Sequence, residues 1–205
     1  TRVVSRIREA LATEVPLRQL FETPAIEGLA AFVEEARQAG QTADAPPLVP
    51  CSRSDPLPLS FAQQRLWFLD QLEPASTAYS MTYALRLRGE LDLPALTRSL
   101  NALVERHESL RTVFAQEDDA PVQVVLSTLA LAVPLVDLTS LPDEEREVEM
   151  QRLRAEEASK PFDLEAGPLI RLQIVGMGNE QHVAFLTLHH IISDGVSMGV
   201  FFREL

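Results

Sequence analysis

Two adjacent histidines, His189 and His190, end an apolar run in the stretch FLTLHHIISDG (185–195). Histidine exchanges a proton near neutral pH, and it also binds metals or packs in protein cores. The apolar run predicts a β-strand over 182–190, and a strand points successive side chains to opposite faces. The two histidines therefore do not share one site, which argues against a two-histidine metal centre.

The end of this strand is a favourable place for chemistry. Both faces of 182–190 are apolar, so we expect a central strand that is covered on both sides. A single histidine in such a strand most often only packs in the core. This pair, however, stands at the carboxyl end of the strand and before a helix expected from about Val196, where α/β proteins commonly bind ligands. Ser193 or Asp194 can cap that helix, and Gly195 can adopt backbone angles closed to other residues.

Arg65 is expected to support this turn from a helix predicted over 60–72. Its neighbours at three and four positions are all apolar: Phe61, Ala62, Phe68 and Leu69. We therefore expect Arg65 to point into the core, with Trp67 on the opposite, polar side. An unpaired buried charge costs several kcal/mol, so the arginine needs a carboxylate. Asp194 is a candidate partner, and the pair would lock the turn that carries His190.

The composition excludes several classes of protein. The net charge is -12, from 30 acidic and 18 basic residues, which argues against a broad nucleic-acid interface. Cys51 is the only cysteine, so an intramolecular disulfide framework and a multi-cysteine zinc site are excluded. No stretch reaches 18 consecutive apolar residues. We interpret the chain as cytoplasmic, with neither a nucleic-acid nor a membrane partner.

The chain divides at a proline-rich stretch. Five prolines fall within 39–58, and we place a linker at 39–56, between a first domain at 1–38 and a second at 57–205. The first domain has helical patterns at about 3–11 and 24–37 but is too short for much of a core, so it is expected to be the tail of a larger domain. In the second, helices and strands alternate as in an α/β fold. Helices are expected at 60–72, from 92, at 141–159 and from 196, and strands at 83–88, 110–115, 122–126, 131–136, 169–175 and 182–190. The last helix is still running at Leu205, so this domain is expected to be truncated.

Four motifs resemble, in order and spacing, those of condensation domains from non-ribosomal peptide synthetases. They are SFAQQRLWFL at 60–69, RHESLRTVF at 106–114, PFDLEAGPLIR at 161–171 and HHIISDG at 189–195. The resemblance implies a fold like that of chloramphenicol acetyltransferase, with two αβ lobes around a tunnel. This chain would contain the amino-terminal lobe.

The resemblance also implies roles for individual residues. His190 would face the tunnel as the catalytic histidine, and His189 would be structural. Asp194 would pair with Arg65, and Gly195 would keep the backbone close to the substrates. The implied reaction is amide formation, in which the amine of an acceptor aminoacyl thioester attacks a donor thioester. His190 would either remove a proton from the amine or hold the amine in place.

Residues 1–36 resemble the end of a peptidyl carrier domain. The resemblance implies phosphopantetheine as the cofactor of the carriers, attached to a serine upstream of Thr1, and no metal. The implied partners are donor and acceptor carrier domains, the carboxyl-terminal lobe and an adenylation domain. Three alternatives stay open: a coenzyme A-dependent acyltransferase of the same fold, an epimerising relative, and a non-catalytic fragment that docks carriers.

Overall fold

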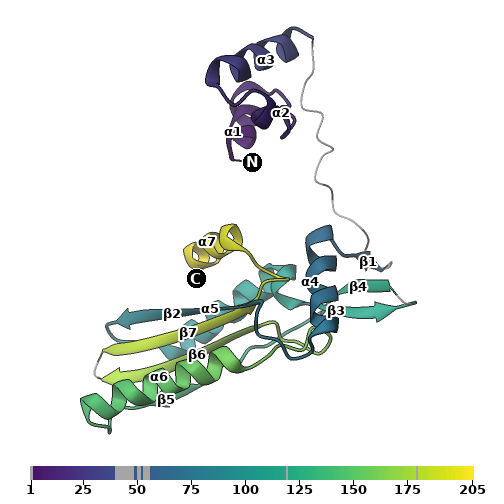
Figure 1. Ribbon diagram of the computed structural model, residues 1–205. Coiled ribbons are helices and arrows are strands. Elements are labelled where there is room, and N and C mark those ends of the chain that lie inside the picture. The colour runs from purple at the N-terminus through teal and green to yellow at the C-terminus, as the bar shows by residue number, and fades with distance from the viewer. Residues whose placement is uncertain (1, 40–48, 50–51, 53–55, 119, 179) are drawn as a thin grey trace. The chain divides into compact units, whose positions relative to one another are not determined.

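The computed structural model describes residues 2–39, 49, 52, 56–118, 120–178 and 180–205 (Figure 1). The chain separates into two compact units, 1–52 and 53–205. Most of the predicted linker, with Cys51, lies outside the described residues.

The first unit is a small helical assembly. It contains α1 (Arg2–Leu11), α2 (Gln19–Glu22) and α3 (Ile26–Gln38). The two helices predicted from periodicity are confirmed, whereas the single turn of α2 was not expected. Val4, Val15 and Val33 form its buried core.

The second unit contains a four-stranded sheet and a three-stranded sheet. Its elements are β1 (Leu57–Pro58), α4 (Phe61–Leu72), β2 (Ser80–Arg88), α5 (Leu93–Arg106), the 3₁₀ helix η1 (Glu108–Arg111), β3 (Thr112–Glu117), β4 (Ala120–Val125), β5 (Leu135–Asp137), α6 (Asp143–Ser159), β6 (Ile170–Gly178), β7 (Gln181–His189) and α7 (Gly195–Glu204). The larger sheet has the order β2-β7-β6-β5, in which only the β5–β6 pair is parallel. The smaller sheet has the order β1-β4-β3.

Strand β7 is central, as its apolar pattern predicts. It lies between β2 and β6, and 183–189 are all buried. Ala184, Leu186 and Leu188 pack into the larger core with α5 and α7, while Val183 and Phe185 pack against α6. Helices thus cover both faces of the sheet, with α6 in front of it in the view of Figure 1. Among the described residues, no helix is both long and apolar enough to cross a membrane.

Helix α4 begins as predicted, but the side of the helix that packs on the core is not the predicted one. Ser60 and Gln63 form the predicted capping box. The apolar stripe, however, points outward: Phe61 is 91% exposed, and Phe68 is exposed too. Arg65 shares this stripe and is exposed, so its predicted burial is wrong. Leu66 and Trp67, on the other side of the helix, pack against the larger core instead.

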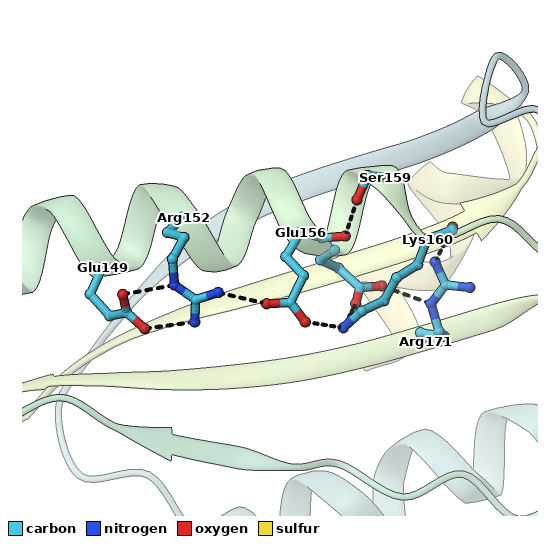
Figure 2. A network of polar contacts seen from close by, with 7 residues as sticks. Glu149, Arg152, Glu156, Ser159, Lys160 and Arg171 are labelled. Carbon is cyan, nitrogen blue, oxygen red and sulfur yellow. Dashed lines mark hydrogen bonds and ion pairs between the residues drawn. The ribbon is translucent and has the colours of Figure 1, made fainter.

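A network of charges ties α6 to β6 (Figure 2). Arg152 bridges Glu149 and Glu156 along the helix. At the end of α6, Arg171 Nε donates to Glu157 Oε1 at 2.7 Å, and Glu157 is only 4% exposed. This buried pair fastens the start of β6 to the last turn of α6.

We expect Glu157→Gln to lower the free energy of unfolding by about 2 kcal/mol, because the Arg171 guanidinium loses a charged and buried acceptor. Urea unfolding of this chain measures it. The matched control is Glu149→Gln, which removes a partly exposed acidic group from the same network and should have a much smaller effect. Equal effects of the two substitutions would contradict the role assigned to the buried pair.

Candidate active site

The turn between β7 and α7 brings four of the predicted site residues together. His189 ends the strand, His190 follows it, and Asp194 is the residue that caps α7, just before Gly195. The Asp194 carboxylate accepts hydrogen bonds from the backbone N–H groups of Val196 at 3.1 Å and Ser197 at 2.8 Å. In return, Asp194 N–H donates to Ser197 Oγ at 2.7 Å. Hydrogen bonds from Ser197 lower the pKa of Asp194, so the carboxylate stays ionised in this role.

His189 is a buried, neutral side chain. It is 3% exposed, and its ring makes an edge-to-face contact with the ring of Phe162, with 6.1 Å between the centroids. Its Nδ1 accepts a hydrogen bond from the Ile191 backbone N–H at 3.1 Å. Burial lowers the pKa of His189 to about 4, with a smaller contribution from the nearby His190. His189 thus holds the turn in shape.

His190 is exposed, and its ring is oriented by the turn itself. Its backbone N–H donates to the Tyr79 carbonyl at 2.8 Å, which continues the pairing of β2 and β7. Its Nδ1 lies 2.7 Å from the Ser193 carbonyl oxygen. A carbonyl only accepts hydrogen bonds, so Nδ1 must carry the proton. In the neutral ring, Nε2 is therefore the unprotonated nitrogen, free to accept a proton or a hydrogen bond.

Arg65 and Asp194 do not form the predicted ion pair. Arg65 lies on the exposed stripe of α4, and no ion pair between the two is found among the described residues. The pairing predicted from the apolar stripe fails because the stripe faces solvent, and the carboxylate is already used by the α7 cap. In this chain, the cap alone accounts for Asp194.

A double-mutant cycle on this chain tests that description. We expect Asp194→Ala to lower the free energy of unfolding by about 1 kcal/mol through loss of the cap. Arg65→Ala should change it by less than about 0.5 kcal/mol, as for other exposed side chains. The two effects should add in the double variant to within about 0.5 kcal/mol. A coupling energy well above about 1 kcal/mol, measured by urea unfolding, would mean that the pair forms after all.

Gly195 has no conformational reason to be glycine in this chain. Its φ lies outside the left-handed region, and a Cβ added there would meet nothing within 4 Å. The expectation that Gly195 adopts backbone angles closed to other residues is therefore wrong. The space beside its Cα is open.

Gln63 is a site residue that the sequence reasoning missed. Its Oε1 accepts from Ser60 N–H in the capping box, which leaves its Nε2 free to donate. Nε2 lies 3.4 Å from the carbonyl oxygen of Ile191, in the histidine turn. The capping box is visible in the sequence, but a contact over 128 positions is not.

Phe162 and Arg171 also support the histidine turn, and the sequence reasoning did not identify them. The guanidinium of Arg171 lies 3.9 Å from the ring centroid of Phe162, and the same ring makes an edge-to-face contact with His189. Both residues belong to the PFDLEAGPLIR segment, which is recognisable in the sequence although these contacts are not. The contacts link the Glu157–Arg171 pair to the packing of the buried histidine.

No cluster of three or more metal-ligating side chains is present within the part of the chain that the structure describes. The turn itself combines a packed histidine, an oriented histidine and a helix cap.

This chain is similar to segments of large peptide synthetases. It is 49% identical over 209 residues to one of the proteins of the linear gramicidin synthase of Brevibacillus parabrevis, covering 100% of this chain and 3% of that protein. It is 44% identical over 205 residues to malpibaldin synthetase of Mortierella alpina, covering 100% of this chain and 4% of that protein. The chain thus spans only a few per cent of the length of these relatives.

A solved structure has the same fold. The first condensation domain of the calcium-dependent antibiotic synthetase, in complex with substrate analogue 2a, matches with a TM-score of 0.66 and 28% identity. The match covers 74% of this chain and 36% of that one. Fold and site thus define an α/β lobe with an HHxxxDG turn at the end of its central strand.

The family is shown by sequence as well. The sequence model of the condensation domain matches residues 53–205. The chain belongs to the condensation-domain family of non-ribosomal peptide synthetases.

Proposed function

We propose that residues 53–205 form the histidine-bearing lobe of a domain that joins two carrier-bound substrates through an amide bond. The amine of an aminoacyl thioester on a downstream carrier attacks the thioester carbonyl on an upstream carrier. The observation that carries the proposal is the orientation of His190, whose Nε2 is left free by the bond between Nδ1 and Ser193 O. Membership of the condensation-domain family supports the same reaction.

The chemistry needs no covalent enzyme intermediate, because a thioester is already activated. The amine nitrogen bonds to the carbonyl carbon, the carbon–sulfur bond breaks, and the upstream carrier leaves as a thiol that takes up the proton lost by the amine. His190 Nε2 accepts that proton or holds the amine by a hydrogen bond. The nearby serines are already used, since Ser193 Oγ donates to the His189 carbonyl and Ser197 Oγ belongs to the helix cap.

The remaining site residues act through the turn. His189 packs under it, Asp194 caps the helix behind it, and Gly195 leaves room for the substrate backbone. The contact from α4 to the turn is made by Gln63, whose Nε2 lies 3.4 Å from the Ile191 carbonyl oxygen, whereas Arg65 is exposed. No side chain of this group is required to hold a metal.

The substrates arrive on phosphopantetheine arms, which enter the site as part of the substrate. We propose that residues 1–38 are the last helices of the upstream, donor carrier, and that its attachment serine precedes Thr1. Their helical pattern and small valine core support this assignment. The further partners are an acceptor carrier, the second lobe of the domain and an adenylation domain.

A reconstitution experiment tests the proposed function. Donor and acceptor carriers are loaded with aminoacyl groups and mixed with the complete condensation domain, and the dipeptidyl thioester is measured by mass spectrometry. We expect product with the complete domain and none with the 205-residue chain, because one lobe cannot hold two substrates in attack geometry. Acylation of a free amine from an acyl-coenzyme A, without carriers, would instead support the acyltransferase alternative.

A further inference from the structure

A polar contact ties the far end of α7 to the end of α5. His107, the first residue after α5, has its Nε2 2.7 Å from Glu204 Oε2, across 97 positions of the sequence. Arg106 Nε lies 3.7 Å from the same oxygen. The hydrogen bond from His107 is the largest of the effects that lower the pKa of Glu204, so the carboxylate is ionised and only accepts hydrogen bonds. His107 Nε2 therefore carries a proton and is the donor.

The near end of α7 begins at the histidine turn. Asp194 caps the helix, and the carbonyl of Ser193, the residue before it, accepts the hydrogen bond from His190 Nδ1. The direction of this carbonyl is therefore set by where the first turn of α7 lies. A helix of ten residues is a stiff element about 15 Å long, so its two ends move together. A tilt at the far end of α7 is thus transmitted to the Ser193 carbonyl.

The middle of α7 is held by packing that is mostly apolar. Met198 and Phe201 are buried in the larger core, and the ring of Phe202 meets that of Tyr83 edge to face with 5.8 Å between the centroids. Apolar burial keeps the helix on the core but is non-directional, so it permits a tilt about these contacts. A charge-assisted hydrogen bond is directional, and the one to Glu204 acts at the end of the helix, where a tilt produces the largest displacement.

We propose that His107 and Glu204 are positioning residues for His190. Their contact fixes the tilt of α7, and with it the Ser193 carbonyl that keeps the proton on His190 Nδ1 and leaves Nε2 free. Both residues act through the backbone of the turn and not on the substrate. The effect on the tautomer of His190 follows from the geometry alone, whereas its consequence for catalysis rests on the proposed function.

The ring nitrogens of His190 test the inference in this chain without any substrate. At about pH 8, where ordinary histidines are neutral, we expect ¹⁵N NMR to show the Nδ1-protonated form in the unmodified chain. Glu204→Ala should give a mixture of the two neutral forms, so that the shifts of the two ring nitrogens move toward each other. Glu204→Gln should keep the unmodified pattern, because its amide oxygen can accept from His107 Nε2. The matched control is Glu105→Ala, which removes an exposed carboxylate in the last turn of α5.

Three results would overturn the inference. They are unchanged His190 shifts in Glu204→Ala, an equal change in Glu105→Ala, and an equal change in Glu204→Gln, which keeps an acceptor for His107. A melting temperature for each variant shows whether it is folded. If Glu204→Ala does not fold, the same comparison is made between His107→Ala, which loses the donor, and His107→Gln, which keeps a donor in its amide.

A double-mutant cycle in the complete condensation domain, with both carriers loaded, tests the catalytic consequence. We expect Glu204→Ala to lower the single-turnover rate about 10-fold and to leave the half-saturating carrier concentration unchanged, because a misdirected His190 impairs attack and not docking. The same substitution should have almost no further effect in a His190→Ala background, since it acts through that ring. An equal loss in both backgrounds would indicate a general structural defect and overturn the inference. Absence of amide product from the unmodified domain would instead contradict the proposed function, and the result on the His190 tautomer would still stand.

Discussion

Replacing His190 by alanine in the complete condensation domain is expected to lower the rate of amide formation about 10²- to 10⁴-fold. The substitution removes the Nε2 that would accept a proton or hydrogen bond from the attacking amine. It should do little to the fold, because the side chain is exposed and its hydrogen bond is to a single carbonyl, that of Ser193. The measurement is single-turnover formation of dipeptidyl thioester with both carriers loaded, beside a melting temperature for each variant.

A conservative variant separates the two possible duties of this histidine. His190→Gln can place an amide oxygen near the position of Nε2, so it can hold the amine but cannot take its proton. Recovery of most of the rate in the glutamine variant would assign His190 to positioning. A rate as low as that of the alanine variant would assign it to proton transfer. Full activity in His190→Ala would remove the residue from the mechanism.

The stability of this chain is expected to fall by about 3 kcal/mol between about pH 6.5 and pH 4 on account of His189 alone. Burial lowers its pKa from 6.5 to about 4 in the folded state. As the pH falls below 6.5, the unfolded chain binds a proton that the folded chain excludes. The contribution is therefore complete above pH 6.5 and is progressively lost down to about pH 4. Urea unfolding over this range measures it.

His189→Asn isolates this effect. Asparagine can place an oxygen near the position of Nδ1, where the Ile191 N–H needs an acceptor, but it does not titrate. The nearby Asp194 does not account for the same effect. Its pKa is lowered from the ordinary value of 3.8 and therefore lies below the range from about pH 4 to pH 6.5. We therefore expect the variant to have a flatter dependence of unfolding free energy on pH, even though its stability at neutral pH is lower. An unchanged slope across the acidic range would contradict the buried, neutral state of the ring.

Much of the fold follows from local signals. Ser60 with Gln63 and Asp92 with Ala95 form hydrogen bonds within three residues, so these helix starts can be predicted directly from their side chains. The apolar run before His189 identifies a central strand because both faces of β7 are covered. The strand expected at 131–136 is wrong over most of its length, since β5 has only three residues and the apolar residues before it form no strand.

The direction in which α4 faces is not a local property. Both sides of this helix carry apolar residues, so periodicity identifies Phe61, Arg65 and Phe68 as one stripe without deciding whether it is buried. Packing decides in favour of Leu66 and Trp67. The predicted ion pair between Arg65 and Asp194 depended on Arg65 being buried. Because Arg65 is exposed, its charge is solvated and needs no carboxylate partner.

The sequence by itself determined that two histidines pointing to opposite faces end a central strand, that a capped helix follows, and that the motifs are those of a condensation domain. These features depend on side-chain alternation and on hydrogen bonds between residues a few positions apart. Only the tertiary structure decided which nitrogen of His190 is free, that Gln63 reaches Ile191, and that the end of α5 contacts the end of α7. Contacts between distant segments depend on which faces the folded chain packs together, and that choice is made by the competition of all its side chains for one core.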